Sequence, residues 1–200
     1  NGYGEGLKEA GTRDERVVAL CCDLTESTRT HHFAEAFPES FVQVGVAEQN
    51  LASLGSGMAA MGKIPFIASY AAFSPGRNWE QIRTTIAYNE ANVKIVGAHA
   101  GVSVGPDGAT HQAIEDIAIT RVIPGMTVIV PCDVHEAQKA TLAAAEHVGP
   151  VYLRLGREKT PVVTTVGSPF TIGKAETYFS NIAGKRKKVG VIVAGVLTYN

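Results

Sequence analysis

Six short apolar runs, separated by longer stretches with helical periodicity, constrain the fold of this chain more than any other feature. The runs are bounded by turn-forming residues, as strands usually are. Strands that are apolar throughout fit a parallel sheet that is covered on both faces. The sequence therefore predicts an α/β fold with a doubly wound, mostly parallel sheet and helices on both faces. The expected strands lie over residues 16–22, 41–44, 64–70, 93–99, 126–131 and 151–155.

Three of the intervening stretches predict helices. Residues 47–61 are rich in small side chains, which would let a helix pack closely. Ser74 and Pro75 read as an N-cap followed by proline at the first helical position, which predicts a helix toward Ala91. Asp133 predicts the cap of a third helix, which ends near residue 147 before a Gly-Pro pair.

The periodicity fades after residue 158, which indicates a change in organisation. Residues 159–188 are rich in proline, threonine and glycine and end in a short basic run, so they predict a linker. The apolar run over residues 189–195 predicts a new strand and turn. We therefore expect a first domain over residues 1–158 and the start of a truncated second domain over residues 189–200.

Composition excludes several classes of partner. The chain has 200 residues, 45% of them hydrophobic, and a formal net charge of −1, which suits one packed core. Such a charge gives no general attraction to nucleic acid or to an anionic membrane, and no apolar stretch is long enough to suggest a membrane span. The cysteines (Cys21, Cys22 and Cys132) have neither zinc-site nor disulfide spacing, so we expect a reducing, cytoplasmic location.

The loop over residues 99–111 concentrates polar chemistry between an apolar run and a helical stretch. His99, Asp107 and His111 lie there among three glycines, which allow sharp turns and close approach to a ligand. Two histidines and a carboxylate can hold a transition metal, but the spacing lacks the i, i+4 pairing of helical metal sites, so we expect no metal ligands in this chain. A turn with Thr110 as a helix cap would explain part of the loop, but not both histidines.

Glu48 opens the small-residue helix directly after an apolar run. One interpretation is a first-turn glutamate, which the helix dipole stabilises by ~0.3–1 kcal/mol. The other is a carboxyl group buried at a cleft, where desolvation raises the pKa and suits the group to proton exchange with a ligand nitrogen. The local pattern leaves both open.

Other polar and aromatic residues follow the expected strands. Tyr70 and Phe73 could fill the core or stack on a flat heterocycle. The segment over residues 23–27 follows the first strand, where ligands of open α/β sheets bind, although many residues at such positions are only caps. Arg154 and Arg157 would either form ion pairs or bind a carboxylate or phosphate.

Taken together, these motifs resemble the transketolase family, specifically the middle or pyrimidine-binding domain of thiamine-diphosphate enzymes. The likeness is strongest to the C-terminal subunit of a split transketolase. It covers about residues 3–157 and the expected strand after the linker. The motifs occur in the order of the family, over residues 23–27, 45–48, 70–73, 99–111, 121–125 and 155–157.

The resemblance implies how the cofactor is bound. Glu48 is similar to the family glutamate that hydrogen-bonds the aminopyrimidine ring nitrogen and favours the form that removes the thiazolium C2 proton. Tyr70 and Phe73 match the aromatic residues beside the pyrimidine. Asp23 would lie against the cofactor. We therefore expect these four residues to bind thiamine diphosphate, with Glu48 also catalytic.

The resemblance also implies how the substrate is bound. His111 resembles the histidine near the reacting carbonyl, so it is the second expected catalytic residue. Asp107 resembles the carboxylate that binds a sugar hydroxyl. Ser27, His99 and Arg157 match positions that hold the sugar phosphate.

Three departures from the family pattern bear on this expectation. A further phosphate-binding arginine of the family falls before residue 1, and Gly76 stands near the position of a further aromatic. The family's GDG motif with a downstream asparagine is absent, because no asparagine lies between Asn92 and Asn181. The diphosphate and its Mg²⁺ or Ca²⁺ would therefore be held by a partner domain or chain.

The expected function is transfer of a two-carbon ketol unit between phosphorylated sugars, as in the pentose phosphate pathway. Activity would require a diphosphate-binding N-terminal transketolase chain or domain, and we expect a homodimer of this chain within a larger assembly. Deoxyxylulose-phosphate synthase is an alternative, but it usually has an acidic residue at the position of His99. The beta subunit of 2-oxoacid dehydrogenases shares the fold and glutamate but not the loop. A noncatalytic interaction module is the alternative of another class.

Overall fold

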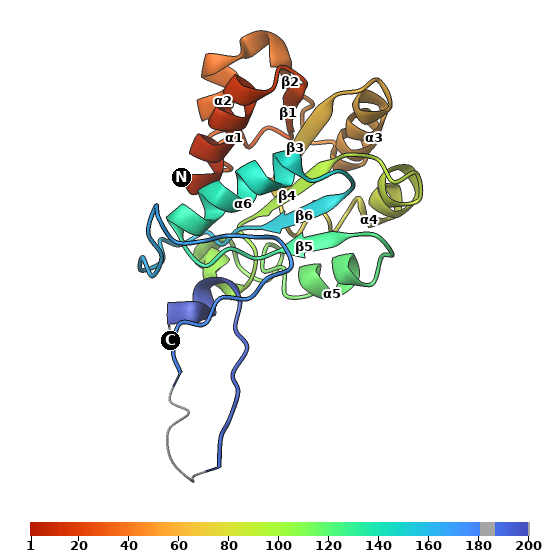
Figure 1. Ribbon diagram of the computed structural model, residues 1–200. Coiled ribbons are helices and arrows are strands. Elements are labelled where there is room, and N and C mark those ends of the chain that lie inside the picture. Colours follow the sequence, from red (N-terminus) through yellow and green to blue (C-terminus); the bar gives the residue numbers. More distant parts are fainter. Residues whose placement is uncertain (181–186, 200) are drawn as a thin grey trace.

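The computed structural model describes residues 1–180 and 187–199. Its six strands form one sheet in the order β2-β1-β3-β4-β6-β5, and every neighbouring pair is parallel (Figure 1). The predicted α/β sheet is confirmed, and each predicted run contains a strand. These are β1 (Val17–Cys21), β2 (Phe41–Gln43), β3 (Ile64–Tyr70), β4 (Lys94–Ala98), β5 (Thr127–Ile129) and β6 (Val151–Arg154).

The register of the central strands brings their carboxyl ends to one edge of the sheet. Cys21 of β1 lies opposite Ala68 of β3, and Tyr70 at the end of β3 lies opposite Ala98 at the end of β4. The loops that follow β1, β3 and β4 consequently leave the sheet at the same edge. Ligands of open parallel sheets bind at this edge.

One face of the sheet is covered by three helices, α1 (Gly2–Arg13), α2 (His31–Ala36) and α6 (Val134–Glu146) (Figure 1). Their apolar side chains form one core cluster with the sheet. Helices α1 and α6 pack closely because Gly2 has no side chain: a Cβ atom there would lie 2.0 Å from the carbonyl oxygen of Val134. Helix α6 begins as predicted, since the Asp133 side chain accepts a hydrogen bond of 2.9 Å from the backbone N–H of Glu136.

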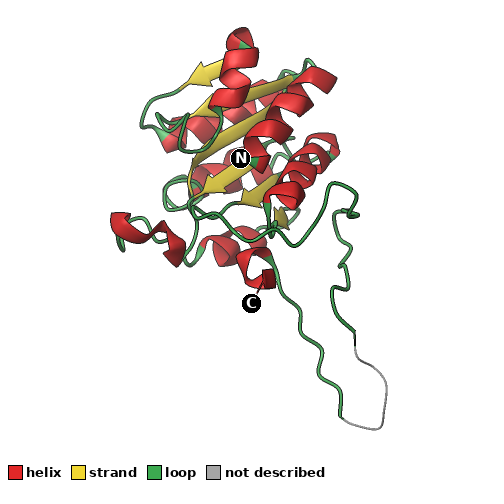
Figure 2. Ribbon diagram, turned by 90° about the vertical axis from the view of Figure 1, so that its left-hand side faces the viewer, coloured by secondary structure: helices red, strands yellow, loops and turns green. Residues whose placement is uncertain are grey.

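The other face is covered by a second set of helical elements, so the sheet is enclosed on both sides, as Figure 2 shows. Helix α3 (Glu48–Ala60), which is rich in small side chains, lies over β1 and β3, with Leu51 and Ala52 fully buried. The elements of this face are α3 (Glu48–Ala60), α4 (Trp79–Gln81), η2 (Ile82–Ala87) and α5 (Asp116–Arg121). None of the helices in the described part of the chain is long and apolar enough to span a bilayer.

The predicted start of a helix at Ser74 is wrong. The segment from Ala71 forms turns, and helix α4 begins at Trp79. Ser74 is buried, and its hydroxyl accepts a hydrogen bond of 3.2 Å from the Asn78 side chain, which also donates to the backbone of Glu48. Contacts with α3 therefore hold this segment as a turn and override the local cap signal.

The predicted strand over residues 189–195 is also wrong. Residues 187–194 have no strand pairing, and Ile192 is 100% exposed. An isolated strand leaves its backbone groups and apolar side chains without partners, so it is not stable. The chain then returns to the sheet at η4 (Gly195–Tyr199), where the N–H of Gly195 donates to the carbonyl of Val130 at 3.0 Å. Residues 181–186, with the first part of the basic run, and residue 200 lie outside the described residues, and the domain and linker boundaries stay predictions.

Candidate active site

Glu48 is both the first residue of α3 and a buried residue, with 2% of its surface exposed. Its Oε1 accepts a hydrogen bond of 3.0 Å from the Ser69 hydroxyl on β3. Its Oε2 lies 3.3 Å from Nη1 of Arg77, which is 52% exposed. The carboxylate is therefore fixed at the carboxyl end of β3, with one oxygen directed to a cation that solvent can reach.

Four of the predicted site residues form one aromatic cluster beside Glu48. The rings of Tyr70 and His99 are stacked, with centroids 4.0 Å apart. Phe73 lies parallel to Tyr70 with centroids 6.4 Å apart, and His111 meets the Phe73 ring edge-on at 5.1 Å. The ends of β3 and β4 and the loop over residues 99–111 together supply this cluster, as the sequence predicts for one shared site.

His99 is held in a restrained environment. Its backbone has the left-handed φ of 56°, and its Nδ1 atom is buried without a hydrogen-bond partner among the residues that the structure describes. Burial lowers the pKa of His99, and the Arg157 guanidinium lowers it further, while the charge of Asp107 acts in the opposite direction. The imidazole is therefore neutral at neutral pH and carries one N–H donor.

The loop after His99 turns through a 3₁₀ segment, η3 (Val102–Asp107). Gly101 and Gly108 flank this segment at φ of 80° and 74°, a region that favours glycine. Arg157 secures the loop, since its Nη1 donates a 2.9 Å hydrogen bond to the carbonyl of Val104. Arg157 thus links the end of β6 to this loop.

His111 and Thr110 close the loop. The Thr110 hydroxyl and His111 Nδ1 share a hydrogen bond of 2.8 Å, which orients the imidazole. The interpretation of Thr110 as a helix cap is wrong, because the next helix, α5, begins at Asp116.

A cavity of about 850 Å³ opens at the carboxyl edge of the sheet. The three residues predicted to hold a phosphate, Ser27, His99 and Arg157, all line it. Arg29 and Lys159 line it as well, together with the carboxylates Asp133 and Glu158. The structure thus gathers the predicted phosphate site from the segments that follow β1, β4 and β6.

Asp23 and Asp107 are exposed, and their side chains have no hydrogen bond or ion pair among residues 1–180 and 187–199. The backbone around Asp23 is nevertheless fixed, since its N–H donates to Gln43 Oε1 at 2.7 Å and Gln43 donates to Thr25 Oγ1 at 2.9 Å. The roles of both aspartates stay predictions. No group of three metal-ligating side chains occurs within the described ranges.

The comparison with protein families agrees with this geometry. The model described as "Transketolase, pyrimidine binding domain" matches residues 1–163. The chain belongs to this family. Among curated relatives, a transketolase C-terminal section of Methanocaldococcus jannaschii is 48% identical over 177 residues, which are 88% of this chain and 56% of the relative. A 6-deoxy-6-sulfo-D-fructose transketolase subunit of a Clostridium species is 40% identical over 86% of this chain and 54% of the relative.

Solved transketolases share the fold. The structure of a split-gene transketolase, an inactive β4 tetramer, has 44% identity and a TM-score of 0.77, and covers 86% of this chain and 55% of that one. This transketolase domain therefore spans about half the length of the relatives that it matches.

Sequence reasoning missed several residues of this transketolase site. Ser69 and Arg77 bind the Glu48 carboxylate, and the Arg77 guanidinium also lies 5.0 Å from the centroid of the Phe73 ring. Of the two alternatives for Arg154, the structure shows the ion pair, because its Nε donates to the buried Asp116 at 2.8 Å.

Proposed function

We propose that this chain is the pyrimidine-binding part of a transketolase, most like the C-terminal subunit of a split enzyme, that transfers a two-carbon ketol unit between phosphorylated sugars. One observation carries the proposal: a buried carboxylate, Glu48, adjoins an aromatic and histidine cluster, and one member of that cluster, His99, also lines the cavity that contains Arg29 and Arg157. Such a reaction belongs to the carbohydrate metabolism of the pentose phosphate pathway. The site requires thiamine diphosphate, and a diphosphate-binding chain or domain is its partner.

The residues present fit the pyrimidine end of thiamine diphosphate. Glu48 offers a carboxylate for a ring nitrogen, and Tyr70 and Phe73 offer aromatic surfaces beside it. When bound, thiamine diphosphate supplies the nucleophilic carbon and the electron sink for cleavage of a carbon–carbon bond. For the diphosphate and its Mg²⁺ or Ca²⁺, the described residues offer no cluster of ligands, so we assign that end to the partner chain.

Each site residue has a distinct task in this proposal. Glu48 holds or moves a proton at the pyrimidine nitrogen from a buried position where water does not compete. Tyr70 and Phe73 orient the ring. His111, which Thr110 holds in place, handles a proton at the sugar carbonyl oxygen. Asp107 and Asp23 extend from loops at the same edge to bind a sugar hydroxyl and the cofactor.

The assembly follows from the same proposal. The chain is active only together with a diphosphate-binding chain or domain and is inactive by itself, and two copies of it associate with two such partners. The related split-gene structure is an inactive tetramer of one subunit type, which supports this view. The three cysteines are free and buried, a state that a reducing cytoplasm maintains.

A substitution at Glu48 tests the function. The chain is mixed with the diphosphate-binding chain of a split transketolase, and ketol transfer and thiamine-diphosphate binding are measured. We expect Glu48→Gln to lower turnover by about 10²-fold or more, because it removes proton transfer but keeps the shape of the side chain. Glu39→Gln, at an exposed glutamate, is the matched control. Retained turnover in Glu48→Gln would overturn the assignment, and no cofactor binding with or without the partner would favour a noncatalytic interaction module.

A further inference from the structure

We propose that Arg29 is an anion-binding residue of the substrate cavity and selects sugars that end in a phosphate or a comparable tetrahedral oxyanion. The inference rests on the proposed function, since it takes the cavity to be the sugar site. The family resemblance assigns no role to Arg29. Arg29 would add a guanidinium to the phosphate site that the matching motifs build from Ser27, His99 and Arg157.

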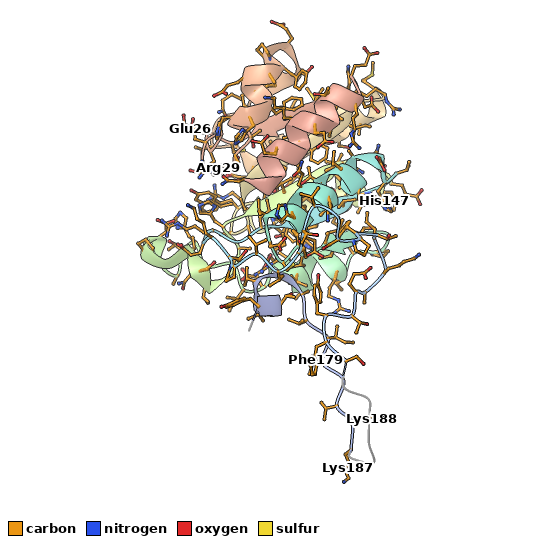
Figure 3. All side chains as sticks on the ribbon, turned by 60° about the vertical axis from the view of Figure 1, so that its left-hand side comes forward. Glu26, Arg29, His147, Phe179, Lys187 and Lys188 are labelled. Carbon is orange, nitrogen blue, oxygen red and sulfur yellow. The ribbon has the colours of Figure 1, made fainter. Side chains whose placement is uncertain are left out.

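The placement of Arg29 is the first observation. It lines the same cavity as His99 and Arg157, although it lies on the segment between β1 and α2. Figure 3 shows Arg29 at the edge of the molecule, close to Glu26 and above the loop that carries residues 99–111. Its charge also acts on His99, where burial and Arg157 are the larger causes of the lowered pKa.

The backbone of Arg29 is the second observation. Its φ is 66°, a left-handed conformation that is unfavourable by about 1–2 kcal/mol for a residue with a side chain. Packing enforces this conformation: a Cβ atom at Gly4 of α1 would lie 2.5 Å from the Arg29 carbonyl oxygen. This backbone conformation favours glycine or asparagine. The presence of a long cationic side chain at this position therefore supports a functional role for its charge, namely anion binding.

Rigid neighbours hold this backbone. Thr28 and Thr30 are buried, and their hydroxyls lie 2.7 Å apart in a hydrogen bond. The N–H of Arg29 donates to the carbonyl of Glu26 at 3.0 Å. The exposed guanidinium therefore extends from a fixed base, which reduces the entropy lost when it binds an anion.

The carboxylates around the cavity are already occupied. Asp133 accepts hydrogen bonds from the backbone of Glu136 and from the backbone and hydroxyl of Thr164. Glu158 lies 3.5 Å from Arg157. Within the described residues no carboxylate is within ion-pair distance of the Arg29 guanidinium.

A guanidinium without a protein partner, beside a second arginine and a neutral histidine, matches the donor set for a phosphate. Guanidinium groups bind such anions through paired, charge-assisted hydrogen bonds. The His99 imidazole, which lines the same cavity, adds a further N–H donor. The cavity of about 850 Å³ has room for a sugar together with that group.

Binding of ribose 5-phosphate and of ribose to the full chain tests the proposal by calorimetry. Arg29→Gln removes the charge, and Arg29→Gly removes the side chain while relieving the left-handed backbone. We expect both variants to bind ribose 5-phosphate about tenfold or more weakly, with ribose binding unchanged. The unfolding temperature of Arg29→Gly should equal or exceed that of the wild type, so its loss of binding is not misfolding. Arg16→Gln, at an exposed arginine paired with Asp14 at the opposite edge of the sheet, is the matched control.

The outcomes separate this inference from the proposed function. Ketol transfer with an unchanged KM for the phosphorylated sugar in Arg29→Gly would overturn the role of Arg29 and leave the function intact. Arg29-dependent binding of ribose 5-phosphate without any ketol transfer would leave this inference standing and overturn the function. Equal affinity of the wild-type chain for ribose 5-phosphate and ribose, including no binding of either, would also overturn the role of Arg29.

Discussion

The Tyr70 ring lies nearly parallel to the His99 imidazole, with centroids 4.0 Å apart and an interplanar angle of 19°. One face of the residue expected to stack on the cofactor is therefore covered by a residue expected to hold the substrate phosphate. Such stacks contribute about 0.5–1.5 kcal/mol beyond burial, so a change at one ring is expected to alter the other. We therefore expect cofactor binding and substrate binding to be coupled through this contact.

Replacement of Tyr70 tests that coupling. Tyr70→Leu removes the ring from His99, so the ring-proton resonances of His99 should shift in NMR spectra, whereas Tyr70→Phe should leave them nearly unchanged. In the complex with the partner chain, we expect Tyr70→Leu to weaken thiamine-diphosphate binding by about three- to tenfold. Identical His99 resonances in the wild type and Tyr70→Leu would contradict the stacked arrangement.

The ion pair between Glu48 and Arg77 leads to a second prediction. Glu48 is buried, but solvent screens the half-exposed Arg77, so we expect a coupling free energy of about 0.5–1 kcal/mol. Urea unfolding of Glu48→Gln, Arg77→Gln and the double variant measures this coupling. Arg13→Gln, at another half-exposed arginine with carboxylate partners, is the control and should show no coupling to Glu48→Gln.

This double-mutant cycle tests whether Arg77 contacts the Glu48 carboxylate. Strictly additive effects would mean that Arg77 does not contact Glu48 in solution. A coupling well above the expected range would mean that Arg77 is less accessible to solvent than its exposure indicates.

The sheet could be predicted from the sequence because strands that are buried on both faces appear as short runs of mostly apolar residues. The run over residues 64–70 is apolar except for Ser69 and the Tyr70 hydroxyl, and it forms β3 over the same residues. The helix at Ser74 could not be predicted correctly, because Asn78 ties this segment to the backbone of Glu48, 30 residues earlier. A local cap signal contains no information about such a contact.

The candidate site was partly predictable for a similar reason. His99 and Tyr70 follow strands, and parallel strands bring such positions to one edge. Their mutual stacking and the contact of Arg77 with Glu48 depend on the paths of separate loops. Arg154 illustrates the limit, since its partner Asp116 is 38 residues away and nothing in the local sequence connects the two.

The lowered pKa of His99 predicts a pH dependence of anion binding. Burial and the neighbouring Arg157 keep His99 neutral in the free protein, and a bound anion would favour the charged imidazolium. Binding therefore takes up a proton, so affinity for sulfate should rise severalfold as the pH falls from about 8 to about 6. Sulfate is a suitable probe because it stays a dianion over this range.

Calorimetry in buffers of different ionisation enthalpy measures that proton uptake directly. His99→Asn should abolish the uptake and flatten the pH dependence, while His135→Asn, in α6, should leave both unchanged. Sulfate affinity that is independent of pH in the wild type would show that His99 does not face the bound anion.

The buried network around Asp116 leads to the last prediction. Asp116 is 1% exposed, and its Oδ2 accepts hydrogen bonds from the Tyr152 hydroxyl at 2.7 Å and from Arg154 Nε at 2.8 Å. Asp116→Asn leaves the Arg154 charge, which is 18% exposed, without its carboxylate, so we expect the free energy of unfolding to fall by about 3 kcal/mol. Tyr152→Phe leaves the ion pair between Asp116 and Arg154 intact, so it should lower the free energy of unfolding by only about 1 kcal/mol.

Urea unfolding of the two variants and of Asp116→Asn combined with Arg154→Met measures these differences. The double variant should recover part of the loss, because it removes the uncompensated charge as well as its partner. The Arg154 side chain also lies close to Gly101, at the start of the loop that carries His111: an Arg154 nitrogen is 3.1 Å from the position that a Cβ atom of residue 101 would occupy. The Asp116 network therefore lies next to the candidate site. If Asp116→Asn lowered stability no more than Tyr152→Phe does, the Arg154 charge would be compensated by solvent, and this network would not hold the loop.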